Sequence, residues 1–168
     1  MTLIKNLFIR NPLDWQIPND GVAEVEQLET LQQELRMFVC DGEYATGLER
    51  ILSSYNSNWT GINQPAVWIS GFYGTGKSHL AKALHALWEN RNFPDGSDPE
   101  GVTELPVIVS DHLRELRIHG KQAGGVFAAS GKLQQAIPLR KGILSIIFKR
   151  LDLPEDYQVT RFILWMKK

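Results

Sequence analysis

The sequence predicts an α/β fold in which an N-terminal helical pair precedes a strand, a loop and a helix. Three observations lead to this prediction. Apolar residues recur at spacings of three and four residues over positions 20–39 and 44–55, which is typical of amphipathic helices. A short apolar run at 66–70 lies between turn-forming residues, as in buried parallel strands. A glycine-rich loop and a third helical pattern at 77–90 follow that run.

The helical pair follows an extended lead-in of about twenty residues that contains Pro12 and Pro18. Asp20 is placed to cap a first helix that runs to about Val39. Its expected inward face comprises Val25, Leu28, Leu31, Leu35 and Phe38. Cys40–Gly42 interrupts the pattern, and the face of a second helix comprises Tyr44, Leu48, Ile51, Leu52 and Tyr55. We therefore assign residues 1–63 to an extended segment and a helical pair.

Residues 64–168 are assigned to the start of a core that contains a parallel sheet. Ala66–Ser70 is the expected first strand, and Gly124–Ala129 the expected second. The helix over 77–90 turns Leu80, Leu84, Leu87 and Trp88 inward. Two strands are fewer than the roughly five of an ordinary nucleotide-binding sheet, so the core is expected to be incomplete.

The remainder of the chain is expected to be a surface loop at 91–105 and further helices. Val107–Val109 is compatible with a strand, but the spacing of Val109, Leu113 and Leu116 favours a helix over 106–119. Pro138 opens a helix whose expected inward face is Leu139, Ile143, Ile146 and Ile147, and Pro154 opens another.

Composition excludes several classes of protein. The 168 residues are 43% hydrophobic and 22% charged, which is ordinary for a globular chain. The single cysteine, Cys40, excludes an internal disulfide framework and a cysteine-built zinc site. No apolar run approaches the roughly 20 residues that span a bilayer, and no secretory leader is recognisable at the start. We expect a cytoplasmic protein without membrane contact.

Charge is divided unevenly along the chain. Residues 1–76 carry four Lys/Arg and nine Asp/Glu, whereas residues 77–168 carry fourteen and ten. Arg114, Arg117 and Lys121 lie at spacings of three and four, so one helix face can present three cations. Such a face suits phosphate or DNA backbone contact. A plain solvated surface is the alternative.

The strongest signal is Gly71-Phe72-Tyr73-Gly74-Thr75-Gly76-Lys77-Ser78, which fits G-x-x-x-x-G-K-[ST] at every fixed position. Glycines allow the backbone to curl so that successive N–H groups point at phosphate oxygens. The helix that follows adds N–H donors and a positive dipole end. In this chemistry the lysine reaches the β- and γ-phosphates and the serine hydroxyl binds Mg²⁺. The pattern predicts a P-loop NTPase-like core.

We therefore expect ATP and Mg²⁺ as cofactors, with Ser78 as the metal ligand. The expected nucleotide-binding residues are Gly71, Phe72, Tyr73, Gly74, Thr75, Gly76, Lys77, Ser78 and His79. Hydrolysis needs an acidic residue at the end of a second apolar strand. The nearest candidate, Asp111, follows only three apolar residues in a segment better suited to a helix. Catalytic residues therefore remain unassigned, and the chain is expected to bind ATP rather than hydrolyse it.

The run Gln64–Leu80 resembles the N-terminal phosphate-loop region of the large ATPases of bacteriophage exclusion (BREX) systems, the BrxC/PglY type. The stretches 35–44, 121–131 and 153–165 are similar to the same family. The resemblance implies a large cytoplasmic prokaryotic ATPase in a phage-defence complex with other subunits. This chain would be its N-terminal part. Only Gly71–Ser78 carry over residue by residue.

Two other functions remain open at this point. One is a small nucleotide or metabolite kinase, although 70 residues precede the loop and no arginine-rich lid is evident. The other is a non-catalytic interaction module that nucleotide stabilises. Phe162–Met166 is apolar in every direction around a helix, so residues 158–168 are expected to drive self-association unless further chain covers them.

Overall fold

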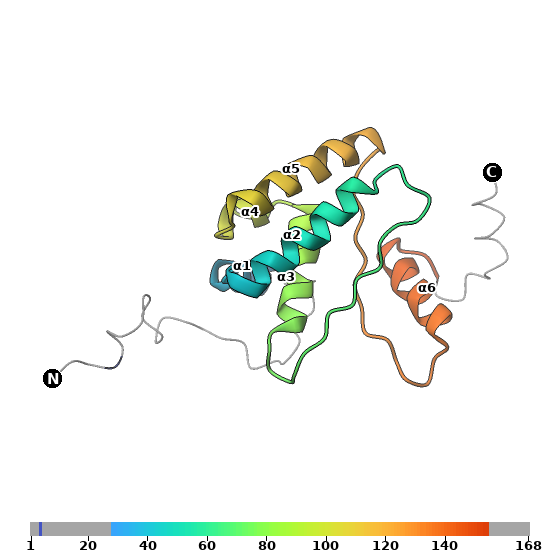
Figure 1. Ribbon diagram of the computed structural model, residues 1–168. Coiled ribbons are helices and arrows are strands. Elements are labelled where there is room, and N and C mark those ends of the chain that lie inside the picture. Colours follow the sequence, from blue (N-terminus) through green and yellow to red (C-terminus); the bar gives the residue numbers. More distant parts are fainter. Residues whose placement is uncertain (1–3, 5–27, 155–168) are drawn as a thin grey trace.

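The computed structural model describes Ile4 and residues 28–154, and Figure 1 shows that the regular elements of 28–154 are helices. Short connections join α1 to α2 and α4 to α5, while long irregular connections precede α3 and α6. The helices in chain order are α1 (Leu28–Met37), α2 (Gly42–Ser57), α3 (Lys77–Glu89), α4 (Pro99–Val102), α5 (Val107–Gln122) and α6 (Leu139–Arg150).

The expected α/β fold is wrong for this part of the chain, because residues 28–154 contain no β-strand. Ala66–Ser70 is an irregular segment in which Val67 is 52% and Trp68 is 89% exposed. Gly124–Ala129, the expected second strand, is irregular too. A strand requires a neighbour to receive its backbone hydrogen bonds. The apolar run 66–70 predicted burial, but the described residues contain no sheet in which it could be buried.

The helical predictions are largely confirmed. The second helix of the expected pair is α2, which begins at Gly42, the last residue of the predicted break, because Asp41 is its N-cap. The helix predicted over 77–90 is α3, and Asn90 ends it in a left-handed conformation. The ambiguous segment 106–119 is helical, as α5, with Pro106 at its N-cap. The predicted start of the first helix at Asp20 lies outside the described residues, and α4 lies within the expected loop 91–105.

The hydrophobic core lies between α1, α2, α3 and α5. α2 packs along α5, and α3 and α4 flank this pair (Figure 1). Cys40, in the turn between α1 and α2, belongs to the same core and is 8% exposed. In the sequence, α2 precedes and α5 follows the domain boundary expected between residues 63 and 64. This boundary stays a prediction. The most deeply buried core side chains are Leu35, Leu48, Leu52, Leu87, Val109, Leu113 and Leu116.

Two polar contacts fix the helices against one another. Lys82 of α3 forms an ion pair with Glu34 of α1 at 2.5 Å, and both side chains are largely buried. The buried amide of Asn56 in α2 donates to the carbonyl oxygen of His112 and to Glu115 Oε2, each at 3.0 Å. Because these partners come from α5, the amide sets the register between α2 and α5.

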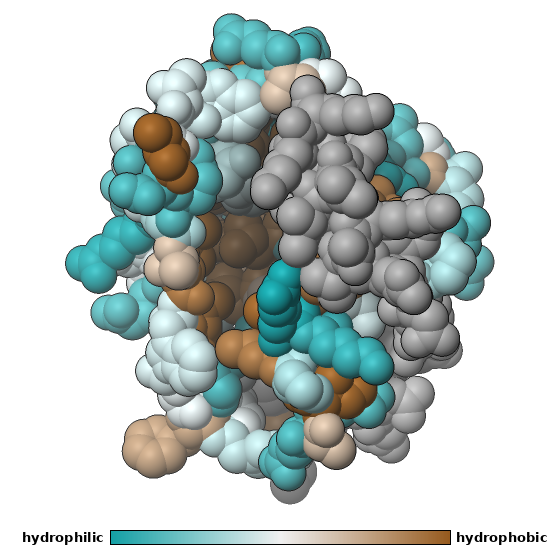
Figure 2. Space-filling view, turned by 90° about the vertical axis from the view of Figure 1, so that its right-hand side faces the viewer, coloured by the Kyte–Doolittle hydropathy of each residue, from teal (hydrophilic) through white to brown (hydrophobic). Residues whose placement is uncertain are grey.

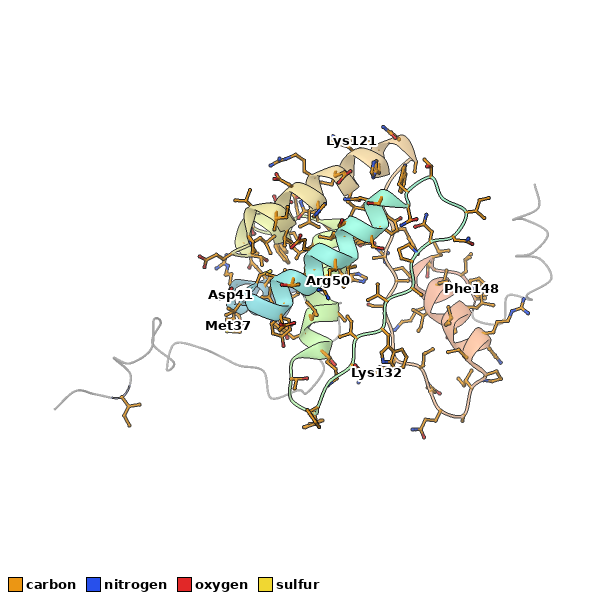
Figure 3. All side chains as sticks on the ribbon, in the orientation of Figure 1. Met37, Asp41, Arg50, Lys121, Lys132 and Phe148 are labelled. Atoms are coloured by element: carbon orange, nitrogen blue, oxygen red, sulfur yellow. The ribbon has the colours of Figure 1, made fainter. Side chains whose placement is uncertain are left out.

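α6 stands apart from this core in Figure 1 and is tied to α3 through Arg150. The predicted inward face of this helix is wrong at two positions, because Leu139 is 65% and Ile143 is 45% exposed. Phe148 is buried instead, at 2% exposure (Figure 3). Gly142 is also buried, and a β-carbon there would approach the Leu133 side chain to 2.8 Å. A single apolar periodicity does not reveal which neighbour a helix meets.

Figure 2 views the molecule from the α6 side and shows a hollow lined by hydrophobic residues. None of the helices described is long and apolar enough to span a membrane. The helix expected after Pro154 and the apolar run Phe162–Met166 lie outside the described residues, as does the self-association expected of 158–168.

Candidate nucleotide-binding site

The loop Gly71–Gly76 leads directly into α3, which begins at Lys77. Two of its glycines use the conformational freedom that the pattern predicted: Gly74 has φ 83° and Gly76 has φ 76°. Gly76 is also the N-cap of α3 and provides no side-chain cap. Left-handed glycines turn consecutive peptide N–H groups toward one side of the chain, which is how a backbone forms an anion-binding concavity.

Lys77 folds back over the loop. Its Nζ donates to the carbonyl oxygen of Phe72 at 2.5 Å and to Thr75 Oγ1 at 3.3 Å. Thr75 Oγ1 in turn donates to the same carbonyl at 2.8 Å. These contacts close the loop into a ring with an ammonium group beside it. A positive charge held at the loop by exposed, exchangeable contacts is available to a phosphate that enters.

The first turn of α3 keeps its backbone donors available. Leu80 N–H is bonded to the Gly76 carbonyl at 2.9 Å, whereas the N–H groups of Lys77, Ser78 and His79 have no acceptor within residues 28–154. The first turn contains no acidic side chain that would neutralise the positive end of the helix. Unsatisfied N–H groups and an uncompensated dipole together attract an anion.

The remaining predicted site residues are divided between solvent and core. Ser78 is exposed, so its hydroxyl is free to meet a metal ion that accompanies a phosphate. Phe72 and Tyr73 form the tip of the loop and are 88% and 103% exposed. The ring of His79 points away into the protein and lies 5.3 Å from the ring of Phe38. Burial lowers the pKa of His79; Glu34 opposes this shift and Lys82 adds to it.

Asp111, the nearest candidate for the acidic residue that hydrolysis requires, does not stand at the end of a strand. Asp111 lies within α5, where its carboxylate receives a bond from Arg114 at 2.8 Å. Among the described residues, no group of three or more His, Cys, Asp or Glu side chains is placed to hold a metal ion. The serine hydroxyl and the phosphates themselves are therefore the oxygen ligands to consider for Mg²⁺ at this loop.

Most of the charge in the predicted cationic row is matched locally. Arg114 pairs with Asp111, and Arg117 pairs with Glu100 at 2.5 Å. Lys121 is exposed near the end of α5, at the opposite end of the molecule from the loop (Figure 3). The row and the loop Gly71–Gly76 thus form two separate features.

Sequence reasoning missed one residue that contacts the loop. Tyr44, assigned to the apolar face of the second helix, donates its hydroxyl hydrogen to the carbonyl oxygen of Thr75. No local pattern signals this contact, because 31 residues separate the partners. The hydroxyl that a tyrosine carries on a largely apolar face was the available indication, and Tyr55 on the same face carries one too.

No family model matches the sequence, and no solved structure matches the fold.

Proposed function

We propose that this chain binds Mg·ATP through the loop Gly71–Ser78. The observation that supports this most strongly is the junction at Lys77. There an ammonium group, three N–H donors that meet no acceptor among residues 28–154 and the positive end of α3 come together behind two left-handed glycines. Such a set of donors suits the oxygens of a polyphosphate. Ser78 would supply an oxygen ligand to Mg²⁺, and the phosphates would supply others.

The proposal extends to the cellular role on the strength of the resemblance to BREX ATPases. We propose that the chain is the ATP-binding region of a large cytoplasmic defence ATPase, acting with other subunits of a phage-defence complex and in contact with DNA. Binding without appreciable turnover is the expected behaviour of this chain alone, since Asp111 is engaged in α5. Kinase activity is the alternative that an acceptor assay tests.

Replacement of Lys77 tests the site. Lys77→Ala removes one charge-assisted contact to phosphate, which is worth about 1.5–3 kcal/mol. The dissociation constant for Mg·ATP should therefore rise by about 10-fold to 150-fold. Titration calorimetry measures the change directly. At a hundredfold excess over its dissociation constant, Mg·ATP should also raise the free energy of unfolding of the wild type by about 2.7 kcal/mol.

Lys121→Ala is the matched control, because it removes the same kind of charge from α5, away from the loop. It should bind Mg·ATP as the wild type does. A wild type whose unfolding is indifferent to Mg·ATP would overturn the proposal. Phosphate release in the same samples, or transfer to added nucleoside monophosphates, would show turnover or kinase activity instead.

A further inference from the structure

The contact between Tyr44 and the loop joins two distant parts of the chain. Tyr44 stands in the first turn of α2, and its hydroxyl bonds the Thr75 carbonyl one residue before the N-cap of α3. A β-carbon added to Gly76 would collide with the same hydroxyl. Glycine is therefore required at position 76 for two reasons, its left-handed φ of 76° and the close approach of Tyr44.

The position of Tyr44 is itself fixed by its surroundings. Its ring meets the buried ring of Phe38 edge to face at 6.0 Å, and Phe38 in turn contacts His79 of α3. The backbone N–H of Tyr44 is bonded to the carbonyl oxygen of Asp41, the N-cap of α2, at 3.1 Å. Figure 3 shows Asp41 beside Met37, where α1 and α2 meet. The hydroxyl is thus presented to the loop from packed structure.

The hydrogen bond determines which way one peptide group faces. A trans peptide is planar, with its carbonyl and its N–H pointing in opposite directions. The bond between Thr75 and Gly76 is trans, so a Thr75 carbonyl directed at Tyr44 directs the Gly76 N–H away from Tyr44. That N–H has no acceptor within residues 28–154. It can therefore join the donors of Lys77 and Ser78 that face an entering phosphate.

We propose that Tyr44 is a positioning residue that pre-orients the Thr75–Gly76 peptide for phosphate binding. The inference rests on the proposed binding of Mg·ATP by the loop. Without the hydroxyl, the peptide can rotate, and only a fraction of molecules present the Gly76 N–H to the ligand. The apparent affinity falls by that fraction, because only the competent conformation binds.

Tyr44→Phe keeps the ring and removes the hydroxyl. Loss of one neutral hydrogen bond corresponds to a rise of about 2-fold to 13-fold in the dissociation constant for Mg·ATP. Tyr55→Phe is the control, because Tyr55 lies on the same helix, packs on Trp88, and has a hydroxyl without a hydrogen bond among the described residues. It should leave the affinity unchanged. An equal affinity for Tyr44→Phe and wild type would overturn the inference.

The amide signal of Gly76 provides a readout that needs no ligand. In ¹⁵N-labelled protein, Tyr44→Phe should shift the Gly76 amide resonance, because the Thr75–Gly76 peptide loses its fixed orientation, whereas Tyr55→Phe should leave it in place. If the wild type does not bind Mg·ATP, the proposed function fails, and this resonance still decides whether Tyr44 positions the peptide. An unperturbed Gly76 resonance in Tyr44→Phe would contradict the inference whatever the binding result.

Discussion

The helical core and the segment that leads into the loop Gly71–Gly76 both contain large apolar side chains, but the fold buries those of the core and leaves those of the segment exposed. In α2, Leu48 is 0% and Leu52 is 1% exposed, because α5 lies along that face. In the approach segment, residues 62–70, Ile62 is 100% and Trp68 is 89% exposed. The difference shows that apolar residues become buried only where another element of the chain can cover them. For a helix one neighbouring face suffices, whereas a strand also needs backbone partners.

The largest expected effect compares these two regions directly. Leu48→Ala should reduce the free energy of unfolding by about 2–5 kcal/mol, because it leaves a cavity at the α2–α5 contact. Trp68→Ala removes a larger side chain but should change the free energy of unfolding by less than about 0.5 kcal/mol, since Trp68 is almost fully exposed. Urea denaturation of both variants measures the contrast.

A comparable loss in Trp68→Ala would show that the approach segment is covered in solution and would remove the distinction. Circular dichroism before denaturation would confirm that both variants retain their helices, so that the unfolding free energies refer to the same folded state.

A second prediction concerns α6, which depends on polar ties rather than on the main core. Glu89 accepts from Arg150 at 2.8 and 2.9 Å and from the Ala128 N–H at 3.0 Å, with its side chain only 7% exposed. Glu89→Gln should destabilise the protein by about 1.5–3 kcal/mol, because hydrogen bonds to charged groups are the stronger kind. Hydrogen exchange of the α6 amides should accelerate, while that of α2 amides should change less.

Glu104→Gln is the matched control for this prediction, because Glu104 is exposed and forms no ion pair or hydrogen bond with another side chain of the described residues. Unchanged protection of α6 in Glu89→Gln would show that packing, not the carboxylate, holds this helix.

The smallest expected effect is a pH dependence at the edge of the core. Hydrogen bonds from Ser97 and Gln32 lower the pKa of Asp95 from 3.8 to about 2. A carboxyl whose pKa is lower when folded stabilises the protein above its unfolded value and loses that contribution as pH falls toward the folded value. Wild type should therefore lose thermal stability between pH 4 and pH 2 more steeply than Asp95→Asn. Parallel profiles for the two proteins would contradict this assignment.

Much of the helical structure could be predicted because the determining signals are local. The apolar spacing of α2 and α5, the cap at Asp41 and the glycines of the loop all lie within a few residues of the structure they specify. The sheet was wrongly predicted, because a strand depends on distant partners that an apolar run does not identify. The contacts of Tyr44 with Thr75 and of Arg150 with Glu89 span 31 and 61 residues, beyond the reach of periodicity.

The buried position of Cys40 makes its rate of alkylation a measure of how often the turn between α1 and α2 opens. Burial raises the pKa of the thiol, and the neighbouring Asp41 carboxylate raises it further. The thiolate that reacts with alkylating agents is therefore scarce while the turn between α1 and α2 stays closed. Because the sequence contains one cysteine, the rate of labelling measures how often that turn opens, two residues from Phe38 and four from Tyr44.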